Sequence, residues 1–394
     1  MPENSAALLN APWMHREDLA ALVTALGEGN ARYVGGAVRD TLLGLPVKDI
    51  DMATVLRPDA VIERLNAAGI RNVPTGIEHG TVTAVLSMGP VEITTLRHDV
   101  STDGRRATVA FAEDWREDAA RRDFTINALY ADPLTGYVHD WFGGMADLAA
   151  RRVRFIGDAR QRIREDHLRI LRYFRFQARF GSTPADEEAE SACSELAATL
   201  KGLSRERVGM ETMNLLGLAD PAPTVQRMRE LGVLEVILPE ADPAALAALV
   251  AAEQAQGIAP DAIRRLAALL PAQPALAEQV AARFRLSAAQ KKRLALAAAR
   301  DGATGDARAL AYRLGRDAAL DRLLISGADV SSIVDWQPPA MPLKGGQIVA
   351  RGVGAGPDVA RILRRVEDRW IAEGFPEGSR IDALLDEILA EPRA

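Results

Sequence analysis

The sequence of 394 residues is poor in the side chains on which several protein classes depend. Its one cysteine, Cys193, excludes a disulfide framework and fits a reducing compartment. Its five histidines are too few and too scattered to suggest a histidine-based metal site. No apolar run approaches the ~18 residues that would span a bilayer. The N-terminus also lacks the basic start and apolar core of a secretory signal. We therefore expect a cytoplasmic protein without a membrane segment.

The charge is not that of a protein that coats nucleic acid, since the net charge is -6. This excludes a uniformly basic surface but leaves local basic patches open. Hydrophobic residues make up 48% of the chain and charged residues 26%, which is typical of a globular protein. At ~150 residues per domain, the length predicts two or three domains.

Strand-like runs are confined to the first third of the chain, and they lie at 32–36, 47–54, 81–87, 90–96 and 107–111. Met88-Gly89 predicts a hairpin turn between the third and fourth runs. Helices are expected within residues 1–30, at 39–44 and at 58–69, and from about residue 114 onward the pattern predicts almost only helices. The expected fold class is therefore α+β, with a small mixed sheet in a head of residues 1–140, an all-α neck of residues 141–220 and an all-α body and tail of residues 221–394.

Two carboxylates in the second run suggest chemistry. Side chains on a strand alternate between faces, so Asp49 and Asp51 project together. Such a pair can hold one or two Mg²⁺ ions, which activate an attacking hydroxyl and neutralise charge on a triphosphate. The alternative is an acidic strand edge that faces water, because a D-x-D pattern alone is common. Glu92, in a later run, is a candidate third catalytic carboxylate, and a surface glutamate is an equally good interpretation.

A glycine pair upstream favours the catalytic interpretation. The segment YVGGAVRD (33–40) predicts a strand that ends at Gly35 and Gly36 and turns into a helix. Paired glycines let backbone N–H groups approach a phosphate, and a helix N-terminus favours its negative charge. Arg39, in the first turn of that helix, can add a charged contact.

These residues resemble the class II nucleotidyltransferases, the family of the bacterial CCA-adding enzymes and poly(A) polymerases. GGAVRD and DIDMAT resemble its nucleotide-binding motif, and four motifs follow in the family's order: RRDFTINALY (121–130, ribose recognition), DWFGGMADL (140–148, hinge), EDHLRILRYFRFQAR (165–179, base selection) and LSRERVGMETMNLL (203–216, closing helix). The resemblance runs over residues 33–216. It implies a polymerase-β-like nucleotidyltransferase head, base recognition in the neck and tRNA binding in the body and tail.

The ribose motif is expected to begin a helix. The resemblance places one of Arg121 and Arg122 on the triphosphate and Asp123 near the ribose hydroxyl, with Asn127 in the same nucleotide-binding motif. Without the family context, helix capping by Asp123 beside solvated arginines is the better interpretation. The polar segment 97–106 resembles a flexible loop that CCA-adding enzymes need for the final adenosine, or it is a plain surface loop.

The base-selection motif supports a chemical argument of its own. Asp166, Arg169, Arg172 and Arg175 follow at steps of three, which we expect to place neighbours on one helix face, although a solvated charged face is the usual meaning of such a run. Cytosine and adenine present an amino donor beside a ring-nitrogen acceptor, whereas uracil and guanine present an acceptor beside a donor. A carboxylate beside a guanidinium fits the first two bases, and the wrong base leaves buried polar groups unpaired at ~1–3 kcal/mol each. The resemblance implies the same roles for Asp166 and Arg169, with Arg172 and Arg175 supporting them or the phosphates.

The expected function is template-independent addition of C, C and A to the tRNA 3′ end from CTP and ATP. Asp49 and Asp51 would hold Mg²⁺, the 3′-hydroxyl would attack the α-phosphate, and pyrophosphate would leave. The nearest alternative is a poly(A) polymerase that uses ATP only, and CC-only addition is a lesser one. A catalytically inactive RNA-binding protein is the alternative from a different class. No stable protein partner and no membrane contact are expected.

Overall fold

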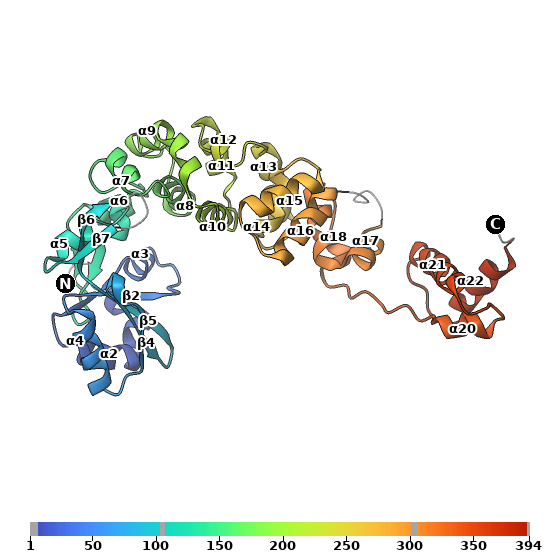
Figure 1. The fold of residues 1–394 in the computed structure, drawn as a ribbon, viewed down its shortest axis with the longest axis horizontal. Coiled ribbons are helices and arrows are strands. Elements are labelled where there is room, and N and C mark those ends of the chain that lie inside the picture. The colour runs from blue at the N-terminus through green and yellow to red at the C-terminus, as the bar shows by residue number, and fades with distance from the viewer. Residues whose placement is uncertain (1–6, 103–106, 301–305, 392–394) are drawn as a thin grey trace. The chain divides into compact units, whose positions relative to one another are not determined.

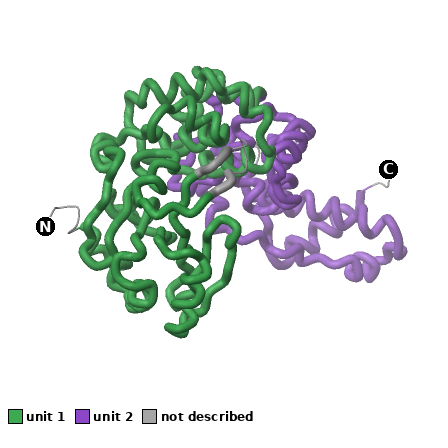
Figure 2. Tube along the Cα trace, turned by 60° about the vertical axis from the view of Figure 1, so that its left-hand side comes forward, with its two compact units in different colours: residues 1–239 green, residues 240–394 purple. Residues whose placement is uncertain are grey.

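The computed structural model describes residues 7–102, 107–300 and 306–391 (Figure 1). The chain forms two compact units, residues 1–239 and 240–394 (Figure 2). The division into head, neck and body at residues 140 and 220 is a functional one and stays a prediction.

Unit 1 begins with a mixed seven-stranded sheet in the order β3-β4-β5-β2-β1-β8-β9. Its strands are β1 (Ala31–Val34), β2 (Ile50–Thr54), β3 (Asn72–Gly76), β4 (Thr81–Leu86), β5 (Gly89–Thr95), β8 (Leu129–Ala131) and β9 (Val138–Asp140). β2 and β5 run parallel, whereas the other neighbours are antiparallel. One face of β2 and β5 is apolar, because Met52, Val91 and Ile93 are fully buried. The mixed sheet followed by helices confirms the predicted fold class.

Helices pack on this sheet where the sequence predicts them. The expected N-terminal helix is α2 (Glu17–Leu26), preceded by a 3-10 turn at Pro12–His15, and its Leu19, Leu22 and Leu26 are buried at helical spacing. The helix expected at 58–69 is α4 (Pro58–Ala67), which lies beside α2 and β4 (Figure 1). The helix expected at 39–44 is α3 (Gly36–Leu42), which begins directly at the glycine pair. The glycines therefore end β1 and start α3 in one turn.

Several short strands differ from the expectation. Residues 97–102 form β6 (Arg97–Thr102) rather than a loop and pair with the expected strand β7 (Ala107–Phe111), while residues 103–106 lie outside the described part. β8 and β9 contradict the prediction that strands end near residue 114. Each has three residues, too few for a period-two pattern to be recognised in the sequence. They form strands because β8 pairs with β1 and β9 pairs with β8.

The rest of unit 1 is helical: α5 (Trp115–Ala120), 3-10 turns at Thr125–Asn127, Ala197–Gly202 and Ile77–His79, α6 (Gly144–Ala149), α7 (Ala159–Glu165), α8 (Arg169–Phe180), α9 (Glu187–Glu195), α10 (Arg205–Leu216), α11 (Ala222–Glu230) and α12 (Leu234–Ile237). Two expectations here are wrong. The ribose motif forms only the 3-10 turn before β8, and the base-selection motif is not one helix. Asp166 is extended (φ -151°, ψ 105°) between α7 and α8, and its side chain accepts the backbone N–H of Leu168 at 3.1 Å, which competes with helix continuation.

Unit 2 consists of helices: α13 (Pro243–Ala255), α14 (Ala262–Leu269), α15 (Pro274–Arg283), α16 (Ala288–Ala299), α17 (Ala307–Leu314), α18 (Arg316–Ile325), α19 (Ser331–Val334), α20 (Gly345–Ala350), α21 (Pro357–Ala372) and α22 (Ser379–Ala390). A buried ion-pair network joins four of these helices, and Asp321 at its centre accepts hydrogen bonds from Arg264 and Arg293. Among the described residues, no helix is both long and apolar enough to cross a bilayer.

Candidate active site

Three carboxylates gather on the exposed face of the sheet. Asp51 lies on β2 directly opposite Glu92 of the parallel strand β5, so both side chains leave the same face. Asp49 directly precedes β2, and its negative charge acts on Asp51. All three side chains are exposed, whereas Ile50 and Met52 between and beside them are buried. The strand alternation expected from the sequence thus brings the predicted catalytic residues together.

The carboxylates repel one another. Desolvation by surrounding protein raises the pKa of Asp51, and the charges of Glu92 and Asp49 raise it further, while Arg122 acts in the opposite direction. A divalent cation would relieve this repulsion. Within the described ranges, no group of three or more His, Cys, Asp or Glu side chains is arranged to hold a metal ion. Fewer than three protein ligands fit Mg²⁺, which one or two carboxylates commonly bind while substrate phosphates and water complete its shell.

Gly35 makes room for Arg122 beside these carboxylates. Its backbone has φ 67° and ψ -117°, a conformation that L side chains rarely adopt. A Cβ atom on Gly35 would lie 3.3 Å from Nη1 of Arg122. A chain of hydrogen bonds fixes the side chain of Arg122. Its Nε donates to the Tyr130 hydroxyl at 2.9 Å, and that hydroxyl donates to Asp118 at 2.5 Å. The positive charge of Arg122 lowers the pKa of Asp51, opposing the effect of the neighbouring carboxylates.

Arg39 lies inside the protein rather than at an open phosphate position. It is 6% exposed. Its Nε donates to Asp40 at 2.8 Å and its Nη1 to Asn127 at 2.5 Å, and its guanidinium lies 4.1 Å from the ring centroid of Phe180. These contacts join α3 to the ribose motif and to the end of α8. Gly36 lies beside the guanidinium of Arg39, since a Cβ atom added to it would lie 3.8 Å from Nη2 of Arg39.

Asp123 and Asn127 continue this network toward α8. Asp123 accepts hydrogen bonds from Asn127 at 3.0 Å and from Nε and Nη2 of Arg172 at 2.8 and 2.5 Å. Burial opposes ionisation of Asp123, but Arg172 and Asn127 outweigh it and hold the pKa of this carboxyl at about 2. Arg175, one turn along α8, donates to Glu211 of α10 at 2.6 Å. Asp123, Asn127 and Arg172 thus form a connected network, which reaches Arg39 through Asn127 and Arg175 through Glu211.

The predicted base-reading pair lies at the start of α8. Asp166 accepts a hydrogen bond at 2.7 Å from Arg207 of α10. Arg169 donates at 2.6 Å to Glu165 and at 3.3 Å to the backbone carbonyl of Arg121. Within the described ranges, Asp166 and Arg169 form no ion pair with each other. Each is paired with a third residue instead.

Comparisons with known proteins agree with the motifs. Residues 31–154 match a family model described as the poly A polymerase head domain, and residues 185–245 match one described as a probable RNA and SrmB-binding site of polymerase A. A mouse protein, CCA tRNA nucleotidyltransferase 1, mitochondrial, is 33% identical over 386 residues, 91% of this chain and 87% of the mouse chain. The chain belongs to the CCA-adding tRNA nucleotidyltransferase family. This confirms the resemblance and identifies the chain as a nucleotidyltransferase.

Further members of the family support the same conclusion. The CCA-adding enzyme of Latilactobacillus sakei is 41% identical over 188 residues, which cover 47% of this chain and 46% of that one. The solved CCA-adding enzyme of Thermotoga maritima, complexed with tRNA, has a TM-score of 0.72 at 20% identity and covers 98% of each chain. That of Bacillus stearothermophilus, in complex with CTP, has a TM-score of 0.69 at 24% identity and covers 94% of this chain and 97% of that one. At these identities the structures show a shared fold.

Three charged partners of the predicted site residues were not predicted from the sequence. Glu165 and Arg207 pair with the base-reading residues, and Glu211 pairs with Arg172 and Arg175. Glu165 lies next to Asp166, and the other two lie in the closing motif one helical turn apart. That i, i+4 spacing was the available signal, but it gives no indication of which helix the residues face.

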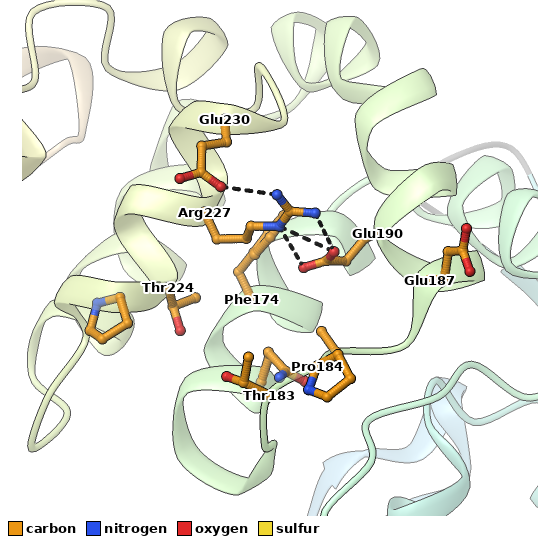
Figure 3. Close-up of a pocket in the computed structure, with 11 residues that line it drawn as sticks. Phe174, Thr183, Pro184, Glu187, Glu190, Thr224, Arg227 and Glu230 are labelled. Atoms are coloured by element: carbon orange, nitrogen blue, oxygen red, sulfur yellow. Dashed lines mark hydrogen bonds and ion pairs between the residues drawn. The ribbon is translucent and has the colours of Figure 1, made fainter.

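A separate hollow lies between α8, α9 and α11 (Figure 3). Its volume is about 670 Å³, and none of the predicted site residues lines it. Arg227, on its wall, donates to Glu190 and Glu230, so its charge is already neutralised. Phe174 and Pro184 are among its apolar lining residues (Figure 3). This hollow is distinct from the carboxylate site.

Proposed function

We propose that this chain adds C, C and A to the 3′ end of tRNA from CTP and ATP, without a nucleic-acid template. The carboxylate face formed by Asp49, Asp51 and Glu92 is the observation that carries the proposal, because it supplies the charge that metal-dependent nucleotidyl transfer needs. Family membership supports the same reaction, and the relatives described above are named as CCA-adding enzymes.

Asp49 and Asp51 would hold Mg²⁺, with Glu92 as a third carboxylate at their side. Bound there, Mg²⁺ would supply charge neutralisation for the triphosphate and acidify the attacking 3′-hydroxyl. Arg122, which is held beside Asp51 by Tyr130, is the protein cation suited to the phosphates. The 3′-hydroxyl attacks the α-phosphate and pyrophosphate leaves. Because the protein forms no covalent bond, its contribution is positioning and electrostatics.

Nucleotide selection is assigned to Asp166 and Arg169. Asp166 accepts from the exocyclic amino group of cytosine or adenine, and Arg169 donates to the adjacent ring nitrogen. Arg172 and Asp123 support this pair through their ion pair, which ties α8 to the ribose motif. Uracil and guanine present the opposite pattern and leave the carboxylate and the guanidinium unpaired.

Incorporation of labelled nucleotides into tRNA that lacks its 3′ end tests the proposal. CTP alone should extend the tRNA by two nucleotides, and CTP with ATP should extend it by three. Long extension by ATP alone would favour a poly(A) polymerase, and no extension at all would favour an inactive RNA-binding protein. UTP incorporation as fast as CTP incorporation would refute the base-reading assignment.

The cytoplasmic location is also a proposal, supported by the single cysteine and its burial. The mouse relative is named as mitochondrial. Fractionation of the source cells tests it.

A further inference from the structure

We propose that Glu165 and Arg207 keep the base-reading pair open by neutralising each member separately. Without them, Asp166 and Arg169 would form an ion pair with each other and would no longer be available to hydrogen-bond a base. The inference rests on the proposed function, since it concerns how the same two residues stay available to a base.

Asp166 is held by α10 and by its own loop. Its Oδ2 accepts from Nη2 of Arg207 at 2.7 Å, and its Oδ1 accepts from the backbone N–H of Leu168 at 3.1 Å. A carboxylate has about four lone-pair positions, so two remain after these bonds. Arg207 therefore fixes the orientation of the carboxylate while leaving acceptor capacity for an amino group.

Arg169 is held in the complementary way. Its Nη1 donates to Glu165 at 2.6 Å and to the carbonyl of Arg162 at 2.9 Å, and its Nη2 donates to the carbonyl of Arg121 at 3.3 Å. A guanidinium has five N–H groups. These contacts of the described residues use three of them and leave N–H groups at Nε and Nη2, which are neighbours on one edge. That edge can donate to a base.

The spacing of Asp166 and Arg169 in the sequence explains why Glu165 and Arg207 are needed as separate ion-pair partners. Asp166, which is extended just before α8, and Arg169, the first residue of α8, carry opposite charges only three residues apart in the chain, so an ion pair between them is a near alternative. An ion pair between them would use the acceptor and the donor that a base requires. α10 lies beside α8 and offers charges in matching order: Arg207 meets Asp166, and one turn later Glu211 meets Arg175. The alternation keeps each charge paired across the helices.

Of Glu165 and Arg207, Arg207 is the more exposed and therefore the better suited to a test of selectivity. The side chains of Arg207 and Asp166 are each 29% exposed. Water partly screens an ion pair at this exposure, so its contribution to folding is smaller than that of a fully buried pair. Loss of Arg207 should therefore change nucleotide discrimination while the protein stays folded, which separates a positioning role from a structural one.

The test compares Arg207→Gln with wild type in single-nucleotide addition to tRNA lacking its 3′ end. We expect the KM for CTP to rise and the preference for CTP over UTP, as a ratio of kcat/KM, to fall at least about tenfold, the effect of one lost charge-assisted hydrogen bond. Arg207→Lys should restore part of the preference because it keeps the charge. The matched control is Arg205→Gln, an exposed arginine on the same helix, which should leave the preference unchanged.

The outcomes separate this inference from the proposed function. If wild type prefers CTP and Arg207→Gln keeps that preference, the inference is wrong and the function stands. Equal loss of activity with every nucleotide, together with a lower melting temperature, shows a structural role and also overturns it. A wild type that shows no preference for CTP over UTP contradicts the proposed function itself.

Discussion

The ion pair between Asp123 and Arg172 gives a quantitative prediction for stability. Asp123 is 8% exposed, and its pKa falls from 3.8 to about 2 because Arg172 and Asn127 outweigh the effect of burial. At 1.36 kcal/mol per pKa unit, this shift corresponds to about 2 kcal/mol of stability at neutral pH. Asp123→Asn removes it. For a unit of this size, the melting temperature should fall by about 4–8 °C.

The pH dependence checks the reasoning behind this number. Because the folded-state pKa is depressed, the stabilisation is fully present above the unfolded pKa and is lost as the pH falls from about 4 to about 2. Urea unfolding of wild type and Asp123→Asn should show a constant difference down to about pH 5 and a shrinking one below about pH 4. The control, Glu28→Gln, alters an exposed carboxylate outside the helices and should change stability by less than about 0.5 kcal/mol. A difference that does not depend on pH would refute the ion-pair account.

Three further predictions concern other sites. Asp51→Asn should raise the melting temperature of the metal-free protein, because the raised pKa of Asp51 means that its ionised form costs stability above that pKa; scanning fluorimetry in a chelator would detect it, and a lower melting temperature would contradict it. Gly35→Ala should destabilise by about 1–3 kcal/mol through its φ of 67° and should raise the KM for CTP by displacing Arg122; unchanged steady-state kinetics would count against that contact. Asp321→Ala should destabilise unit 2 by about 3–5 kcal/mol, because Arg264, Arg265 and Arg293 would keep only Glu253 and Asp261 as carboxylate partners and one positive charge of the network would lose its compensation. The preference for CTP over UTP should not change; a loss of preference would show that the body takes part in base selection.

Local patterns were enough to predict the catalytic face. The position of Asp51 follows from strand alternation, and a hairpin turn predicted at Met88-Gly89, which the structure places one residue earlier at Ser87-Met88, brings β4 and β5 together. The glycine pair predicts the turn into α3. All of these depend on residues within a few positions of one another, where sequence periodicity carries the information.

The network behind the site could not be predicted in the same way. Arg39 and Asn127 are 88 residues apart and meet only because β1 and β8 are neighbours in the sheet. A pattern of three-residue steps indicated one helix through Asp166, but the side chain of that aspartate bonds to the backbone and ends α7 before it. Which helix Arg207 faces depends on packing, and no spacing within the chain reveals it.

Addition of a single cytidine by Asp49→Ala tests the central claim most directly. If Asp49 and Asp51 hold the catalytic metal, the variant loses several kcal/mol of transition-state stabilisation, which is about a thousandfold in rate. Single-turnover incorporation of labelled CTP into tRNA lacking its 3′ end measures this, with Asp59→Asn as an exposed control that should match wild type. A rate for Asp49→Ala equal to that of wild type would contradict the assignment of the carboxylate face as the active site.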